Sequence, residues 1–130
     1  MTALPKLLAL GVAGGIGTLA RYGLANLAHR FTRGSFPIGS LVVNLLGCLL
    51  IGVVMSLVRE HQAFRPETRT VICVGLLGGF TTFSAFGFET FELVRRGAFV
   101  LAGANVAGNV VLGIGAVWLG TLAGRALFHG

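Results

Sequence analysis

Aspartate is absent from this 130-residue chain, and only 11% of its residues are charged. The acidic side chains are the glutamates at positions 60, 67, 89 and 92. Acid–base hydrolysis needs a positioned pair of proton-transferring groups, and carboxylate-held magnesium needs acidic ligands in one place. No set of nucleophile, base and acid can be assembled from this inventory. The sequence therefore does not predict an enzyme.

Cysteine is also scarce. Cys48 and Cys73 belong to no CxxC motif and to no Cys/His cluster, so a metal site of that kind is not indicated. Both fall within apolar stretches, where we expect them to be small buried hydrophobic side chains.

Apolar residues make up most of the chain: 55% are hydrophobic, and the mean hydropathy is +0.88. A transmembrane helix needs about 20 predominantly apolar residues. Four such stretches, at about 4–28, 36–58, 71–91 and 98–122, fill nearly the whole sequence. We predict an all-α membrane protein with four transmembrane helices, which form a single transmembrane domain over residues 1–130.

The net charge is +6, but the basic residues are scattered at the ends of the predicted spans. Contact with anionic lipid headgroups explains this distribution better than nucleic-acid binding does. If the spans alternate in direction, one side carries Lys6, Arg59, Arg65, Arg69 and Arg125, and the other carries Arg21, Arg30, Arg33, Arg95 and Arg96. The charge difference that orients a membrane protein is then zero. This balance favours insertion in both directions and an antiparallel homodimer; the alternative is that one charge near the first span decides the orientation.

Glycine is abundant, with 21 residues. Pairs at four-residue spacing occur at Gly11 and Gly15, at Gly75 and Gly79, and at Gly120 and Gly124. Small residues at this spacing let two helix backbones approach closely. Because a bundle of four helices has little interior of its own, we expect these faces to form a dimer interface.

The third apolar stretch is interrupted near its middle by GGFTTFSAF, residues 78–86. Irregular backbone at membrane depth is tolerated only inside protein or beside a wet cavity. A break at Gly78–Thr81 would free backbone carbonyls, which suit a small cation. Phe80, Phe83 and Phe86 recur every three residues; such a stripe is usually core packing, but ring edges are partly positive and can attract an anion. The local chemistry predicts a small-ion pathway.

Polar residues in other spans extend this prediction. Asn44 supplies two donors and one acceptor that a dehydrated anion could use, and a helix–helix hydrogen bond is the alternative. Arg21 is expected to face a water-filled vestibule or to reach the membrane interface. Asn105 and Asn109 lie one turn apart and suggest a polar track on the fourth span.

Three stretches of the chain resemble the CrcB/Fluc family of fluoride channels. They are Gly14-Gly15-x-Gly17 followed by Arg21-Tyr22, then Pro37-x-Gly39-Ser40-Leu41-x-Val43-Asn44, then residues 75–89. The resemblance covers nearly the whole chain, and the length, the number of spans and the charge balance agree with it.

That resemblance implies a fluoride-selective channel in the plasma (inner) membrane, through which passive fluoride efflux lowers cytoplasmic fluoride. It implies a dual-topology antiparallel homodimer with two pores. It also implies a structural sodium ion on the dimer axis, held by the backbone carbonyls of Gly78 and Thr81 from each subunit.

The resemblance also implies roles for individual pore residues. By the family motif, Phe83 and Phe86 form an aromatic box whose ring edges contact fluoride, Asn44 is the pore asparagine and Arg21 the vestibule arginine. Ser84, Ser40 and Glu89 match weaker polar positions beside the pore. The chain departs from the family at Ser40 and Ala85, where threonine is common, and in the fourth span, where Asn109 and Gly113 replace hydroxyl-bearing residues.

Two other functions compete with a channel. A small dual-topology multidrug or cation–proton antiporter needs a carboxylate within the membrane, but the first span has none and Glu89 lies near the end of the third. Such a transporter would also use an aromatic cage of tryptophan and tyrosine, and the chain has only Trp118 and Tyr22 of these two residue types. A non-transporting membrane subunit would explain the glycine pairs but not Asn44 or the broken span.

Overall fold

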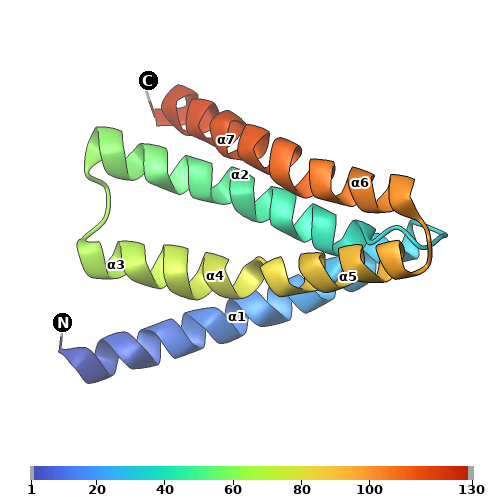
Figure 1. The fold of residues 1–130 in the computed structure, drawn as a ribbon. Coiled ribbons are helices and arrows are strands. Elements are labelled where there is room, and N and C mark those ends of the chain that lie inside the picture. Colours follow the sequence, from blue (N-terminus) through green and yellow to red (C-terminus); the bar gives the residue numbers. More distant parts are fainter. Residues whose placement is uncertain (1, 129–130) are drawn as a thin grey trace.

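The computed structural model describes residues 2–128, and every regular element in that range is helical (Figure 1). The first two segments are α1 (Ala3–Arg30) and α2 (Ile38–His61). The third contains α3 (Pro66–Thr70), the π-helical η1 (Val71–Leu76), α4 (Leu77–Phe80) and α5 (Phe83–Arg95). The fourth contains α6 (Phe99–Ala107), the π-helical η2 (Gly108–Leu112) and α7 (Gly113–Phe128).

Four helical segments are long and apolar enough to cross a membrane: Ala3–Arg30, Ile38–His61, Pro66–Arg95 and Phe99–Phe128. The prediction of an all-helical chain with four such segments is confirmed. The second helix begins two residues later than expected, at Ile38, directly after Pro37. Proline has no backbone N–H, so it is tolerated at a helix start but not inside one.

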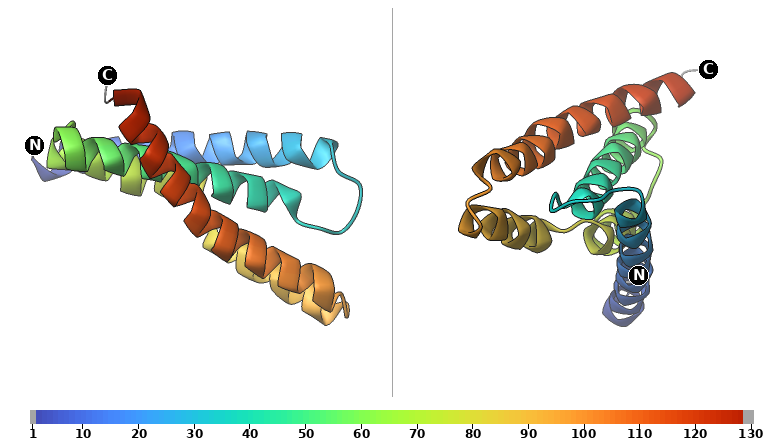
Figure 2. Two further views of the ribbon diagram at one scale, coloured as in Figure 1. Left: turned by 90° about the horizontal axis from the view of Figure 1, so that it is seen from above. Right: turned by 90° about the vertical axis from the view of Figure 1, so that its right-hand side faces the viewer.

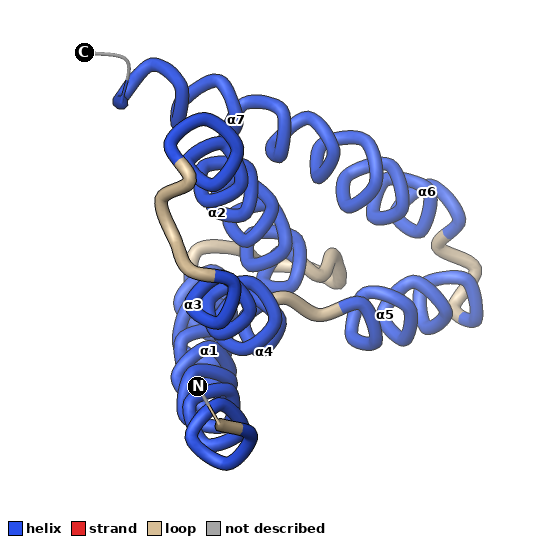
Figure 3. Tube along the Cα trace, turned by 90° about the vertical axis from the view of Figure 1, so that its left-hand side faces the viewer, coloured by secondary structure: helices blue, strands red, loops and turns tan. Residues whose placement is uncertain are grey.

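The segments run up and down, so that the start of α1, the end of α7 and the α2–α3 connection share one end of the molecule (Figure 1). The α2 helix packs along α7 and also contacts α1. In turn, α1 packs against η1 and α4. The α5 helix pairs with α6, and both diverge from α1 (Figures 2 and 3). The break before α5 thus divides the third segment into a half that packs on α1 and a half that packs on α6.

Two of the three glycine pairs pack helices of this one chain together. Gly75 and Gly79 lie against α1, where a Cβ on Gly79 would overlap the backbone of Gly14. Gly120 and Gly124 lie against α2 in the same way. The expectation that these two pairs form a dimer interface is therefore wrong, because they already bring together the first and third spans and the second and fourth spans of one chain. The third pair, at positions 11 and 15, meets no atom within 4 Å.

The helix break lies at Thr81–Thr82, not at the glycines before it. Gly78 and Gly79 belong to α4, whereas Thr81 (φ −86°, ψ 160°) and Thr82 (φ −147°, ψ 112°) are extended. β-branched side chains lose rotamer freedom in a helix and favour extended backbone. The Thr82 hydroxyl then caps α5 by accepting a hydrogen bond from the Ala85 N–H at 3.2 Å. A capping threonine at this position stops one helix and starts the next.

Candidate functional site

The Asn44 side chain on α2 holds the break in place. Its Oδ1 accepts a hydrogen bond from the Thr82 N–H at 2.8 Å, and its Nδ2 donates to the Thr82 carbonyl at 3.0 Å. In a continuous helix the Thr82 N–H would donate to the carbonyl of Gly78. The amide of Asn44 replaces that helical partner, so the backbone groups of the break are satisfied by a side chain from another segment.

A series of hydrogen-bonded side-chain amides extends from Asn44 to the fourth segment. Asn44 Nδ2 also donates to Asn109 Oδ1 at 2.9 Å. Asn109 Nδ2 donates to the backbone oxygen and to Oδ1 of Asn105, at 2.9 and 3.0 Å. The prediction of a polar track on the fourth span fits this arrangement, and the track reaches α2 through Asn44.

At its other end, this series of amides contacts α5. Asn105, which is fully buried, donates from Nδ2 to Thr90 Oγ1 at 2.9 Å. The Thr90 hydroxyl donates to the Phe86 carbonyl at 2.7 Å. The network therefore fixes α5 at two points, Thr82 at its start and Thr90 one turn beyond Phe86.

A cavity of about 330 Å³ lies beside the break. It is lined by Asn44, Gly47, Cys48, Ile51, Cys73, Leu77, Gly78, Thr81, Thr82, Phe83, Phe86, Asn109 and Val110. Both π-helical segments contribute to its wall, and such segments are frequent at functional sites. Six of the ten predicted site residues meet here: Phe83, Phe86, Asn44, Asn109, Gly78 and Thr81.

The two phenylalanines at this cavity are arranged edge to face. The ring centroids of Phe83 and Phe86 are 5.5 Å apart at an interplanar angle of 61°. Phe83 is 83% exposed in the single chain, whereas Phe80 is buried. The three-residue phenylalanine stripe is not continuous, because the break turns Phe80 into the core.

The cysteines also differ from expectation. Cys48 and Cys73 are half-buried and line this cavity rather than being wholly enclosed. Their thiols give the largely apolar wall two polarizable atoms.

Four predicted residues lie outside this cavity. Ser40 donates to Glu89 Oε1 at 2.8 Å, which joins α2 to α5. Glu89 lines a second cavity of about 200 Å³. Arg21 on α1 and the exposed Ser84 line neither cavity. Arg21 Nε and Glu89 Oε2 are buried atoms that find no hydrogen-bond partner within residues 2–128.

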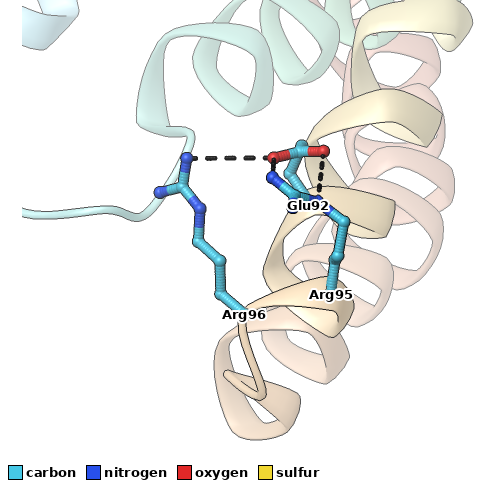
Figure 4. Close-up of polar contacts among 3 residues, drawn as sticks. All are labelled: Glu92, Arg95 and Arg96. Carbon is cyan, nitrogen blue, oxygen red and sulfur yellow. Dashed lines mark hydrogen bonds and ion pairs between the residues drawn. The ribbon is translucent and has the colours of Figure 1, made fainter.

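The second cavity lies beside a charged cluster at the end of α5. Glu92 pairs with Arg95 at 2.7 Å and with Arg96 at 3.8 Å (Figure 4). Both arginine side chains are more than 60% exposed. Positive charge at a helix C-terminus also suits the helix dipole.

Backbone carbonyl oxygens at the cavity have the chemistry that fits a small hard cation. Gly78 and Thr81 both line the cavity, and the Gly78 carbonyl has lost its usual partner, since the Thr82 N–H turns to Asn44. Within the described residues there is no group of three or more His, Cys, Asp and Glu side chains that could hold a metal.

Sequence reasoning missed two residues of the network, Thr82 and Thr90. The signal for Thr82 was its place before the α5 pattern, with a helix-capping side chain. Thr90 gave no signal of its own, because its role depends on Asn105 facing it from another segment.

Comparison with known proteins places these residues in a family. Residues 8–121 match the family model described as "CrcB-like protein, Camphor Resistance (CrcB)". The chain belongs to the CrcB family. Curated CrcB relatives agree over almost their whole length. The chain is 46% identical over 120 residues to a protein of Solibacter usitatus, covering 92% of this chain and 98% of the relative.

Two further relatives give the same result. The chain is 42% identical to a protein of Nitratidesulfovibrio vulgaris, covering 92% of this chain and 97% of the relative. It is 43% identical to one of a Geobacter species, covering 94% and 98%. All three relatives carry the name "Fluoride-specific ion channel FluC".

Proposed function

We infer that the chain is a fluoride-selective ion channel that gives passive fluoride efflux and lowers cytoplasmic fluoride. The observation that carries this inference is the full-length match to relatives named as fluoride-specific channels. Channels of this kind are not enzymes. The arrangement of amides, hydroxyls and phenylalanine edges around one cavity is chemistry that suits a small anion.

The pore chemistry follows from these side chains. Fluoride is small and strongly hydrated, so a pore must offer donors in place of water while binding weakly enough to release the ion. The partly positive edges of Phe83 and Phe86 meet the second need better than a ring of cationic side chains would. Arg21, whose buried Nε has no hydrogen-bond partner among residues 2–128, suits a water-filled vestibule. Ser84 and Ser40 would lie along the approach.

The proposed assembly is an antiparallel homodimer with dual topology. Five basic residues fall at each end of the bundle, so no charge difference favours one orientation. Phe83 is largely exposed in the single chain, and a second copy would enclose it. The open face at positions 11 and 15 of α1 is a further surface on which a helix could pack closely.

A structural sodium ion is proposed at the Gly78 and Thr81 carbonyls. Hard oxygen ligands suit this cation, but one chain contributes only two of them here. Six or so oxygens are usual around a hard cation of this size. A second copy would double the number of carbonyls, so the proposed sodium site depends on the proposed dimer. When bound, the ion would offset the negative ends of carbonyl dipoles that face each other.

The membrane location completes the proposal. The chain is a multi-pass membrane protein, and we place it in the plasma (inner) membrane, in contact with lipid along its exposed apolar faces. The break lies near the middle of the span Pro66–Arg95 and would sit at mid-membrane depth. Asn44 would supply there the internal hydrogen bonds that lipid cannot.

The alternative, a small multidrug or cation–proton antiporter, is not favoured. Proton exchange within a membrane requires a carboxylate placed in the transport path. Glu89 accepts a hydrogen bond from Ser40, and it does not line the cavity that holds the amides and the phenylalanines. The relatives are named as fluoride channels rather than drug transporters.

Fluoride release from liposomes tests the proposed function. Vesicles that hold purified protein and potassium fluoride are diluted, valinomycin is added, and a fluoride electrode follows release. We expect rapid release by the natural chain and none by Phe83→Ile or Phe86→Ile, with both variants eluting as dimers. No release by correctly folded natural protein would overturn the channel assignment. Normal release by both variants would overturn the role of the aromatic pair.

A further inference from the structure

Among the described residues that line the cavity, the Thr82 hydroxyl is a buried donor whose hydrogen has no acceptor. Both Asn44 Nδ2 hydrogens are committed, one to the Thr82 carbonyl and one to Asn109. The Thr81 hydroxyl donates to the Leu77 carbonyl at 3.1 Å. Neither side chain can meet an incoming anion without giving up a bond that holds the break.

Thr82 differs from these neighbours. Its hydroxyl oxygen accepts from the Ala85 N–H, but no residue of the range 2–128 accepts a hydrogen bond from its hydroxyl hydrogen. Thr82 is only 9% exposed, and it lines the cavity next to Phe83. Buried polar side-chain atoms normally have at least one hydrogen-bond partner, and the Thr82 oxygen has one in the Ala85 N–H, so its hydrogen is left available to donate into the cavity. A buried donor that is available at a cavity can bind a ligand that accepts a hydrogen bond.

We propose that the Thr82 hydroxyl is the hydrogen-bond donor that fluoride meets at the helix break, and that Asn44 is the positioning residue that fixes it there. This inference rests on the proposed function and names a residue that decides specificity in that same pathway. Fluoride is the strongest hydrogen-bond acceptor among the halides, so a well-placed hydroxyl donates to it more strongly than to chloride and offsets more of its larger dehydration cost.

The surroundings make this hydroxyl a good donor. The Ala85 N–H donates to its oxygen, and a hydroxyl that accepts a hydrogen bond is polarised to donate more strongly. Thr82 also stands at the N-terminus of the 13-residue helix α5, where the helix dipole favours negative charge. Asn44 holds the Thr82 backbone from both its N–H and its carbonyl, so the hydroxyl keeps one position. The donor is neutral, so an anion bound there can still leave.

Substitution at Thr82 tests the role of the hydroxyl in the liposome assay. Thr82→Val keeps the shape but removes the donor, and we expect fluoride efflux to fall at least about tenfold, which corresponds to 1.4 kcal/mol or more in the barrier. Thr82→Ser keeps both the donor and the helix cap, and it should stay within about threefold of the natural chain. The control is Thr121→Val, since the Thr121 hydroxyl donates to Val117 on α7, away from the cavity. Normal efflux by Thr82→Val, or equal loss by Thr82→Ser, would overturn the proposal.

A binding measurement separates this proposal from the channel function itself. Threonine methyl groups are labelled with ¹³C in the natural chain, and sodium fluoride is titrated in detergent against sodium chloride at equal ionic strength. We expect the Thr82 methyl resonance to shift saturably with fluoride and not with chloride, while the Thr121 resonance stays constant. A Thr82 resonance that ignores fluoride overturns the proposed site even if the liposomes release fluoride. A saturable shift without any release supports the site and overturns only the channel function.

Discussion

Removal of the Asn44 amide should destabilise the fold at the break. Asn44→Ala deletes three hydrogen bonds, two to Thr82 and one to Asn109. Side-chain hydrogen bonds in membrane proteins contribute about 0.6 kcal/mol on average, and those in soluble proteins about 1 kcal/mol. Three of them give a predicted loss of about 2–3 kcal/mol. Because Thr82 is buried, water cannot easily replace its lost partners.

The assay is reversible unfolding in mixed micelles, titrated with denaturing detergent and followed by circular dichroism. The matched control is Asn26→Ala, which removes an exposed amide from α1 and should change stability by less than about 0.5 kcal/mol. A loss in Asn44→Ala no larger than that of the control would refute the view that Asn44 holds the break. Fluoride efflux by the same variant should also be lost, since Thr82 would no longer be fixed.

Three further predictions concern other parts of the chain. Gly120→Ala should lower stability by about 1–3 kcal/mol, since its Cβ would overlap the α2 backbone, whereas Gly115→Ala faces open space and should not; equal melting temperatures would contradict this. Asn105→Leu should cost about 2 kcal/mol in the same detergent titration, because it leaves buried partners unsatisfied; an unchanged midpoint would show that the amide network contributes little. Glu92→Gln should leave the unfolding midpoint nearly unchanged, and the small effect should shrink further in high salt, because its arginine partners are exposed; a fall in midpoint as large as that of Asn105→Leu would assign these pairs a structural role.

The sequence alone predicted the segments and much of the site, because apolar length and motif spacing are local properties. Four spans follow from hydropathy, and the interrupted third segment follows from its clustered glycines and threonines. The position of the break did not follow, since glycine has the lower helix propensity. The helix breaks at Thr82 instead, because the side chain of Asn44, 38 positions earlier in the sequence, hydrogen-bonds to the Thr82 backbone.

Long-range partners account for the remaining differences. Gly75 and Gly120 were expected at an interface between chains, and a glycine pair does not reveal whether its neighbour belongs to the same molecule. The hydrogen bond between Ser40 and Glu89 joins residues 49 positions apart, so no local sequence pattern predicts it. Asn109 was predicted as part of a polar track, but its link to Asn44 required the fold. The dimer, the sodium ion and the membrane orientation remain predictions.

The most direct test of a fluoride-selective path at the broken helix is a selectivity measurement on one vesicle preparation. Liposomes that contain the natural chain are loaded with equal concentrations of potassium fluoride and potassium chloride, and separate electrodes record both anions after valinomycin is added. We predict that fluoride leaves rapidly while chloride leaves no faster than from protein-free vesicles. Release of both anions at similar rates, or of neither, would contradict the account.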